Sequence, residues 1–389
     1  MADAQQQEFE DFQTDDGASS VGESSTAESL SSLRSSILDY RRENGRTYHR
    51  MSDGKYAFPN DELEQDRLDL THHLWGLTWD GNICNSPKKD GAKRVLDVGT
   101  GTGVWAMDYA DEHPESIVLG VDLSPIQPQF VPPNCSFEVD DVEKEWTWRE
   151  PFDFIFIRSM IASFSSWPDM IAKAYENLEP GGYIELQDSM FPMLCQDGTM
   201  TEDFKPLKWS NMVTEATEKL GRSMFVAASF KQMLEDAGFV DVVERRKVWP
   251  FNPWPKDAKL RELGFWAQES AFKGIEAITM ALFTRVLDWS PEEARVFCAE
   301  VRNEHKKIEV HAYYEIYGVW GRKPEETDED EAAAAPAPPP PPAPAPASSP
   351  SSVPASSPAP APASASAPTT TLASAPAPAP APARAGDES

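Results

Sequence analysis

The stretch RVLDVGTGTGVWAMDYADEHPESIVLGVD, residues 94–122, decides the fold of this chain. Its first apolar run, 94–99, predicts a buried parallel strand, and the glycines that follow predict a tight turn. Apolar side chains at helical spacing predict a helix over 104–112. A second apolar run, 117–121, ends at Asp122. A strand, a glycine turn, a helix, a strand and a terminal acid together predict a nucleotide-binding βαβ unit.

The turn has the pattern G-x-G-x-G, formed by Gly99, Thr100, Gly101, Thr102 and Gly103. Residues without a Cβ atom take positive φ angles easily and let a ligand approach the backbone. Asp122 follows the glycines at about the 20-residue spacing expected of an acid that binds the hydroxyls of a ribose. Asp97, just before the turn, would repel a pyrophosphate and attract an ammonium or sulfonium group. The pattern therefore favours S-adenosylmethionine over a dinucleotide, and an NAD(P)-dependent reductase is the weaker alternative.

The two ends of the chain differ in composition from its middle. Of the 389 residues, 1–33 are rich in Ser, Gln and acids, and 324–389 become a Pro/Ala/Ser tract after a run of acids. Such segments bury too little apolar surface to offset the entropy of ordering, so both are predicted to be disordered. The middle is predicted to hold an N-terminal helical cap, 34–93, and an α/β domain, 94–323, with helical insertions at 201–222 and 256–306.

Charge and cysteine content exclude several classes of function. The formal net charge of −29 argues against nucleic-acid binding. The four cysteines lack metal-site spacing, which argues against a metal or disulfide framework and for a reducing compartment. No signal sequence and no run of 18 apolar residues is visible, so we expect an intracellular protein, cytoplasmic or nuclear, without a membrane association.

The remaining pattern predicts alternating strands and helices. A helix over 29–43 and a second one capped by Asn60, with a stripe of Leu63, Arg67, Leu70 and Leu74, precede the glycine turn. The whole is predicted to be a Rossmann-like, seven-stranded, mostly parallel sheet with helices on both faces and an antiparallel last strand. Further strands are expected at 135–139, 152–157, 183–187, 240–249 and 310–320, and further helices at 167–178, 205–220, 230–238, 257–287 and 291–306.

With these elements placed, five motifs resemble, in order, those of the class I S-adenosylmethionine-dependent methyltransferases. They are VLDVGTGTGVWA (95–106), the acid Asp122, VDDVE (139–143), FDFIFIRSM (152–160) and LEPGGYIELQD (178–188). A narrower resemblance is to the fungal LaeA-like group. It lies in YRRENGRTYHR (40–50), YAFPNDELEQDRLDLTHHLW (56–75) and SFSSWPDMIAKAYENLEPGGYIELQD (163–188).

The resemblance implies positions for the cofactor. The turn residues Gly99, Thr100, Gly101 and Gly103 should line its methionine and ribose, and Asp122 should bind the ribose hydroxyls. Asp97 should orient the turn or hold the cofactor's ammonium group through water. Beside the adenine we expect Leu123, Asp141 with Asp140 as its rival, and Val142.

Beyond the fourth strand lie Arg158 and Ser159, at the edge where the sheet opens. Arg158 is expected either to contact the methionine carboxylate or to form a structural salt bridge. The N-terminal residues Tyr40, Asn44, Tyr48 and His49 are expected either to cover the cofactor as a lid or to pack in the core.

The catalytic residues are not identified by this pattern. Methyl transfer depends mainly on alignment in a dry pocket. Candidates for a base are His72, Asp188 and His73, which could pair with Asp69 on the same helix. Aromatic residues between the helical insertions and the sheet edge are expected to contribute to an acceptor pocket.

The predicted function is methyl transfer to an unidentified small molecule or protein in fungal secondary metabolism or its regulation. The alternative is a regulatory or scaffold protein that binds the cofactor, acts through protein partners and has little or no activity.

Overall fold

A computed structural model describes residues 40–49, 51 and 57–325. The predicted disordered segment 1–33 lies outside the described residues, as does 324–389 apart from its first two residues. The predicted helix over 29–43 lies outside them up to residue 39.

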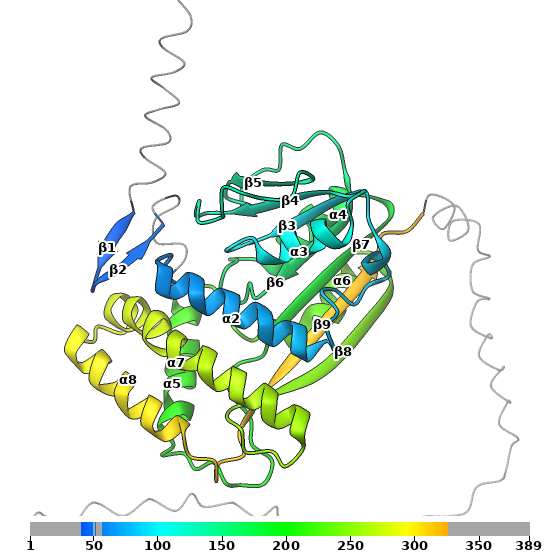
Figure 1. Ribbon diagram of the computed structural model, residues 1–389. Coiled ribbons are helices and arrows are strands. Elements are labelled where there is room, and N and C mark those ends of the chain that lie inside the picture. Colours follow the sequence, from blue (N-terminus) through cyan, green and yellow to red (C-terminus); the bar gives the residue numbers. More distant parts are fainter. Residues whose placement is uncertain (1–39, 50, 52–56, 326–389) are drawn as a thin grey trace, which may run out of the picture. The chain divides into compact units, whose positions relative to one another are not determined.

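A seven-stranded sheet runs through the described part, with the strand order β5-β4-β3-β6-β7-β9-β8 (Figure 1). Strand β9 is antiparallel to both of its neighbours, while the pairs from β5 to β7 are parallel. The predicted sheet is therefore confirmed, including its antiparallel last strand. The strands are β3 (Arg94–Val98), β4 (Ile117–Asp122), β5 (Cys135–Val139), β6 (Phe152–Arg158), β7 (Leu178–Ser189), β8 (Val240–Pro250) and β9 (Tyr313–Arg322).

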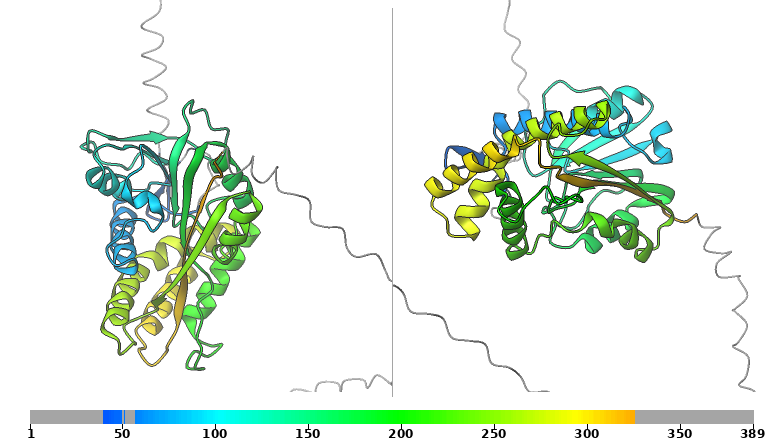
Figure 2. Two further views of the ribbon diagram at one scale, coloured as in Figure 1. Left: turned by 90° about the vertical axis from the view of Figure 1, so that its right-hand side faces the viewer. Right: turned by 90° about the horizontal axis from the view of Figure 1, so that it is seen from below.

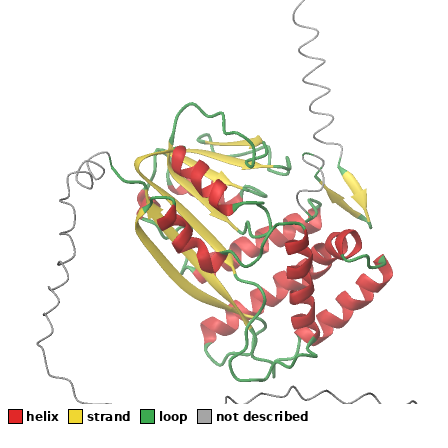
Figure 3. Cartoon of the chain, turned by 180° about the vertical axis from the view of Figure 1, so that it is seen from behind, coloured by secondary structure: helices red, strands yellow, loops and turns green. Residues whose placement is uncertain are grey.

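The central strand β6 shows why helices cover both faces of the sheet. All its residues from Phe152 to Ile157 are buried. Phe154 and Phe156 pack with Trp105 and Tyr109 of α3 (Val104–Glu112). Ile155 and Ile157 pack instead with residues of α4 (Trp167–Glu176) and α6 (Phe230–Asp236), on the face seen in Figure 3. A continuous apolar strand is stable only where both faces are covered.

The remaining helices gather at one end of the sheet, beside the carboxyl ends of its parallel strands (Figures 1 and 2). Helix α7 packs against α2, α5 and α8. The two predicted helical insertions therefore meet in the structure, although the domain boundaries themselves stay predictions. These helices are α2 (Glu62–Thr78), α5 (Lys205–Lys219), α7 (Ala258–Val286) and α8 (Pro291–His305), and short 3₁₀ turns occur at Pro87–Asp90 and Ala227–Ser229.

Residues 41–43 form a strand, so the predicted helix is wrong there. Strand β1 (Arg41–Glu43) pairs with β2 (Arg46–Tyr48) in a hairpin. The two residues between them have φ angles of 53° at Asn44 and 84° at Gly45. An Asn-Gly pair is a strong signal for such a two-residue turn, although it also fits the end of a helix.

The start of α2 also differs from the prediction. Asp61, not Asn60, is the N-cap, because its carboxylate accepts a hydrogen bond from the backbone N–H of Glu64. Asn60 donates instead to Ser124 Oγ, at 3.3 Å, beyond the end of β4. Leu63 is 65% exposed, so the predicted apolar stripe does not begin there. The helix buries Glu64 at this position instead.

We predict that replacing Gly103 destabilises the protein more than replacing another glycine with a positive φ angle. Gly103 has φ 81°, and an added Cβ would lie 2.4 Å from Phe137 Cζ. Gly103→Ala should lower the free energy of unfolding by about 2–4 kcal/mol, through backbone strain and overpacking. Gly198 has φ 76° with nothing within 4 Å of such a Cβ, and is the control. Gly198→Ala should cost about 1–2 kcal/mol. Urea unfolding measures both, and equal losses would contradict the prediction.

Candidate active site

A cavity of about 320 Å³ opens at the carboxyl ends of β3, β4 and β6 and extends under α2 and α7. The order of strands reverses between β3 and β6, and in such sheets this is where ligands bind. One part of the wall comes from the sheet and its loops, and the other from the helices. Nearly every predicted cofactor residue lies in the first part: Asp97, Gly99, Thr100, Gly101, Asp122, Leu123, Asp141, Val142, Arg158 and Ser159.

The carboxylate of Asp122 is held by two backbone donors. The N–H of Gly101 donates to Oδ2 at 2.9 Å, and the N–H of Ser124 donates to Oδ1 at 2.9 Å. Burial raises the pKa of Asp122 and these two N–H groups oppose the rise. Each oxygen keeps a further lone pair, so the carboxylate can still accept from a pair of neighbouring hydroxyls.

Asp97 lies beneath the glycine turn, with 4% of its surface exposed. Burial raises its pKa to about 6, although Thr100 and Arg158 favour the charged form. Thr100 Oγ1 donates to Asp97 Oδ2 at 2.6 Å. This contact fits the predicted role of Asp97 in orienting the turn.

Gly103 is not among the cavity residues. Its missing Cβ makes room for the ring of Phe137, which explains the third glycine without a ligand. Asp140 and Asp141 both line the cavity, so either carboxylate is within the predicted adenine region. Asp141 is buried, and its Oδ1 accepts from the backbone N–H of Glu143 at 3.2 Å.

The candidate bases are separated by the structure. His72 lines the cavity, and its Nε2 lies 2.9 Å from Asp108 Oδ2. His73 lies outside this cavity, with its ring edge-on to Trp266. The predicted pair of Asp69 and His73 is not formed, because Asp69 Oδ1 accepts from Thr102 Oγ1 at 2.7 Å.

Asp188 also lines the cavity, at the end of β7. Burial raises its pKa to about 7, while three backbone N–H groups favour the charged form. Met160 and Ile161 donate to Oδ2 and Ser189 donates to Oδ1. These contacts fix the loop after β6, and a role for Asp188 as a base stays a prediction.

The hairpin residues predicted as a lid are absent from the described lining of the cavity. Tyr48 is buried under the guanidinium of Arg285, whose carbon lies 4.7 Å from the ring centroid. Arg285 also forms a two-pronged ion pair with Glu43. Core packing is therefore the better description of Tyr48.

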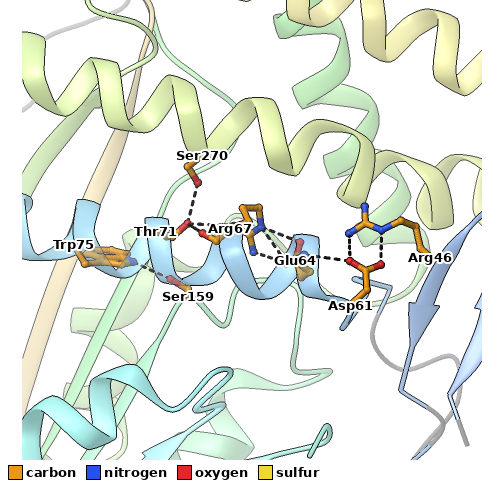
Figure 4. Close-up of polar contacts among 8 residues, drawn as sticks. All are labelled: Arg46, Asp61, Glu64, Arg67, Thr71, Trp75, Ser159 and Ser270. Carbon is orange, nitrogen blue, oxygen red and sulfur yellow. Dashed lines mark hydrogen bonds and ion pairs between the residues drawn. The ribbon is translucent and has the colours of Figure 1, made fainter. Parts of the chain in front are cut away.

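A polar row on α2, missed by the sequence reading, faces α7 and lines the cavity (Figure 4). Glu64 is 2% exposed, and both its oxygens accept from Arg67, the closest contact being 2.6 Å. Thr71 Oγ1 lies 2.9 Å from Ser270 Oγ on α7. The Glu–Arg spacing of i, i+3 was the available signal, but the pattern placed Arg67 on an apolar stripe.

His305, the last residue of α8, was also missed. It lines the helical part of the cavity and is 3% exposed. Its ring stacks on Phe251 with centroids 3.5 Å apart. Burial lowers the pKa of His305 to about 3, so the imidazole is neutral near pH 7.

In the described part of the chain, no group of three His, Cys, Asp or Glu residues could hold a metal ion. None of the four cysteines, Cys84, Cys135, Cys195 and Cys298, forms a disulfide in the described residues. Within the same residues, no helix combines the length and apolar character needed to cross a membrane.

The residues at the sheet end fit S-adenosylmethionine. An acid with free lone pairs suits a ribose diol, and the glycines of the turn allow close approach. A family model described as a methyltransferase domain matches residues 79–244. The fold, the turn and its acid define a class I methyltransferase that uses S-adenosylmethionine.

Three curated relatives narrow the class. Methyltransferase pytC of Aspergillus terreus is 41% identical over 300 residues, which cover 77% of this chain and 93% of the relative. Secondary metabolism regulator LAE1 of Cochliobolus heterostrophus is 36% identical, over 73% of this chain and 95% of the relative. Protein-methionine methyltransferase laeA of Emericella nidulans is 34% identical, over 73% of this chain and 77% of the relative. The chain belongs to the LaeA-like family of fungal methyltransferases.

We predict that His305→Phe makes the protein less sensitive to acid. An unfolded histidine has a pKa of about 6.5. Between that value and about 3 the unfolded chain binds a proton that the folded chain does not, so stability falls as the pH drops. Phenylalanine keeps the stacked ring and does not titrate. Relative to the wild type, the variant should gain about 2 kcal/mol on going from pH 8 to pH 5. Urea unfolding at the two pH values measures this, and an unchanged difference would refute it.

Proposed function

We propose that this methyltransferase acts on a small, largely apolar acceptor of fungal secondary metabolism, bound in the helical part of the cavity. The observation that carries the proposal is the aromatic wall of that part, formed by Phe191, Trp209, Phe251 and Tyr314. The names of the regulator relatives support a setting in secondary metabolism.

The wall is rigid as well as apolar. Trp209 Nε1 donates to Thr279 Oγ1 at 2.7 Å, which fixes the indole against α7. The ring of Phe191 lies between its neighbours, with its centroid 4.8 Å from that of Tyr314 and 6.4 Å from that of Trp209. Fixed aromatic faces suit an acceptor with a flat or apolar body.

Helix α7 leaves room for this acceptor. The residues that it directs to the cavity include Ala267, Ser270, Ala271 and Gly274, which share one helical face. Their small side chains keep the space between α7 and the sheet open. Sheet and helix residues line the same cavity, so acceptor and cofactor would meet in one enclosed space.

The bound cofactor supplies a methyl group on a sulfonium sulfur, which a nucleophilic acceptor atom attacks in line. Asp122 would hold the ribose, and the turn ordered by Asp97 would carry the methionine part. The buried walls exclude water and align the two reactants, which is the main requirement of this reaction.

A second candidate acceptor is a protein methionine, because one relative is named a protein-methionine methyltransferase. A methionine side chain is slender and apolar and suits the same wall. The regulator names are also consistent with protein partners. A regulator would be expected in the nucleus, and an enzyme for small molecules in the cytoplasm. A cofactor-binding regulator with little or no turnover is the remaining alternative.

Methyl labelling tests the acceptor class. We expect that tritiated S-adenosylmethionine labels a small molecule in the low-mass fraction of a fungal extract, rather than the protein fraction. Ala271→Phe should lower this labelling at least about tenfold by filling the space beside α7, with S-adenosylhomocysteine affinity kept. Val296→Phe, on the outer face of α8, is the control and should label as the wild type does. Label in protein alone would favour the second candidate, and no label in either fraction would favour the regulator.

Asp122→Ala should abolish tight cofactor binding. Two charge-assisted hydrogen bonds to the ribose would be lost, which predicts about a hundredfold weaker binding of S-adenosylhomocysteine. Isothermal titration calorimetry measures the change, with thermal unfolding as the test of folding. Unchanged affinity in a folded variant would refute the role of Asp122.

A further inference from the structure

Arg158 is a half-buried cation with more hydrogen-bond donors than partners. A guanidinium group has five N–H donors. Among the described residues, its hydrogen-bond partner is Nδ1 of His72, at 2.8 Å from Nη2. None of the described carboxylates forms an ion pair with it, so the predicted structural salt bridge is not present in this part of the chain. Since Arg158 lines the cavity, its remaining donors are available to an anionic ligand.

His72 and Asp108 fix the direction of this guanidinium. An arginine N–H can only donate, so Nδ1 of His72 must be the acceptor and its proton must be on Nε2. Nε2 lies 2.9 Å from Asp108 Oδ2 on α3, so this N–H donates a hydrogen bond to the carboxylate. The guanidinium carbon also lies over the rings of Trp75, at 5.9 Å, and Phe156, at 5.5 Å. Three elements, α2, α3 and β6, therefore hold one cation.

The charges around Arg158 match an amino acid. Asp97, at the end of the neighbouring strand β3, also lines the cavity and interacts electrostatically with Arg158. The two do not form an ion pair, so a buried negative group and a half-buried positive group lie apart in one cavity. Burying separate charges is costly unless a ligand compensates them. A zwitterion with its ammonium group toward Asp97 and its carboxylate toward Arg158 would do so.

We propose that Arg158 binds the α-carboxylate of the cofactor's methionine part and that His72 is the positioning residue that aims it. The inference rests on the proposed function, because it requires S-adenosylmethionine in the cavity. A carboxylate on the acceptor is the other source of the same chemistry, and the experiment separates the two.

The experiment titrates three ligands into the full chain by calorimetry. S-adenosylhomocysteine has both the carboxylate and the amine, its decarboxylated analogue keeps the amine alone, and methylthioadenosine lacks both. Arg158→Met should weaken the binding of S-adenosylhomocysteine about ten- to hundredfold and leave the affinities for the other two ligands unchanged. An equal loss for all three ligands, or no loss for any, overturns the assignment. The second of these results would direct attention to an acceptor carboxylate.

Variants of His72 test the positioning role. His72→Leu should selectively weaken the binding of S-adenosylhomocysteine, in the same pattern as Arg158→Met but to a smaller extent. His72→Asn should restore most of the affinity, because its amide oxygen can accept from Arg158 near the place of Nδ1. His73→Leu, on the same helix but outside the cavity, is the matched control and should bind as the wild type does. A His72→Leu variant with the wild-type preference for the carboxylate-bearing ligand overturns this role.

The proposed function fails separately. If the wild type bound none of the three ligands, the cofactor itself would be excluded. Asp122→Ala should weaken the binding of all three ligands together, because all of them contain the ribose. A selective loss at Arg158 and a general loss at Asp122 therefore distinguish the two claims.

Discussion

The carboxylate of Asp122 ties the end of β4 to the glycine turn that follows β3. One oxygen accepts a hydrogen bond from the backbone N–H of Gly101 in the turn, and the other from that of Ser124, two residues after Asp122. Ser124 Oγ in turn accepts from Asn60, just before α2. The sheet, the glycine turn and the segment that leads into α2 thus meet at Asp122. The shape of the cavity at its sheet end depends on this junction, because Asn60, Gly101, Asp122 and Ser124 all line the cavity there.

Buried carboxylates recur around the cavity, and backbone N–H groups accompany most of them. Asp188 accepts three such donors, and Glu185, deeper in β7, accepts two from Asn85 and Ser86. Burial raises the pKa of both groups, and the N–H dipoles recover part of the lost solvation. Asp188 thereby fixes the loop after β6 at the cavity, whereas Glu185, which is not among the cavity residues, fixes the segment before β3.

Local patterns in the sequence were enough to predict the sheet and most of its cavity residues. The strands β3 and β6 are mainly apolar, and the turn between β3 and α3 consists largely of glycine. The errors have local causes too: an Asn-Gly pair fits a helix end as well as a hairpin turn, and Asn60 and Asp61 are both favourable N-cap residue types. Contacts over long sequence separations left no such signal. Arg158 meets His72, 86 residues away, and His72 meets Asp108, 36 residues away. Only the fold brings these residues together, whereas the residue types alone left Arg158 with two roles.

The place of β9 has a consequence for how the chain folds. This strand, the last of the described sheet, inserts between β7 and β8. During synthesis, one edge of β7 therefore stays unpaired until residues 313–322 are made, more than a hundred residues later. An unpaired strand edge readily joins other chains, and long-range pairing slows folding. The ribosome-bound chain thus exposes the open edge of β7 to chaperones or to aggregation for a long interval. Pairing with β9, once that strand has left the ribosome, ends this exposure.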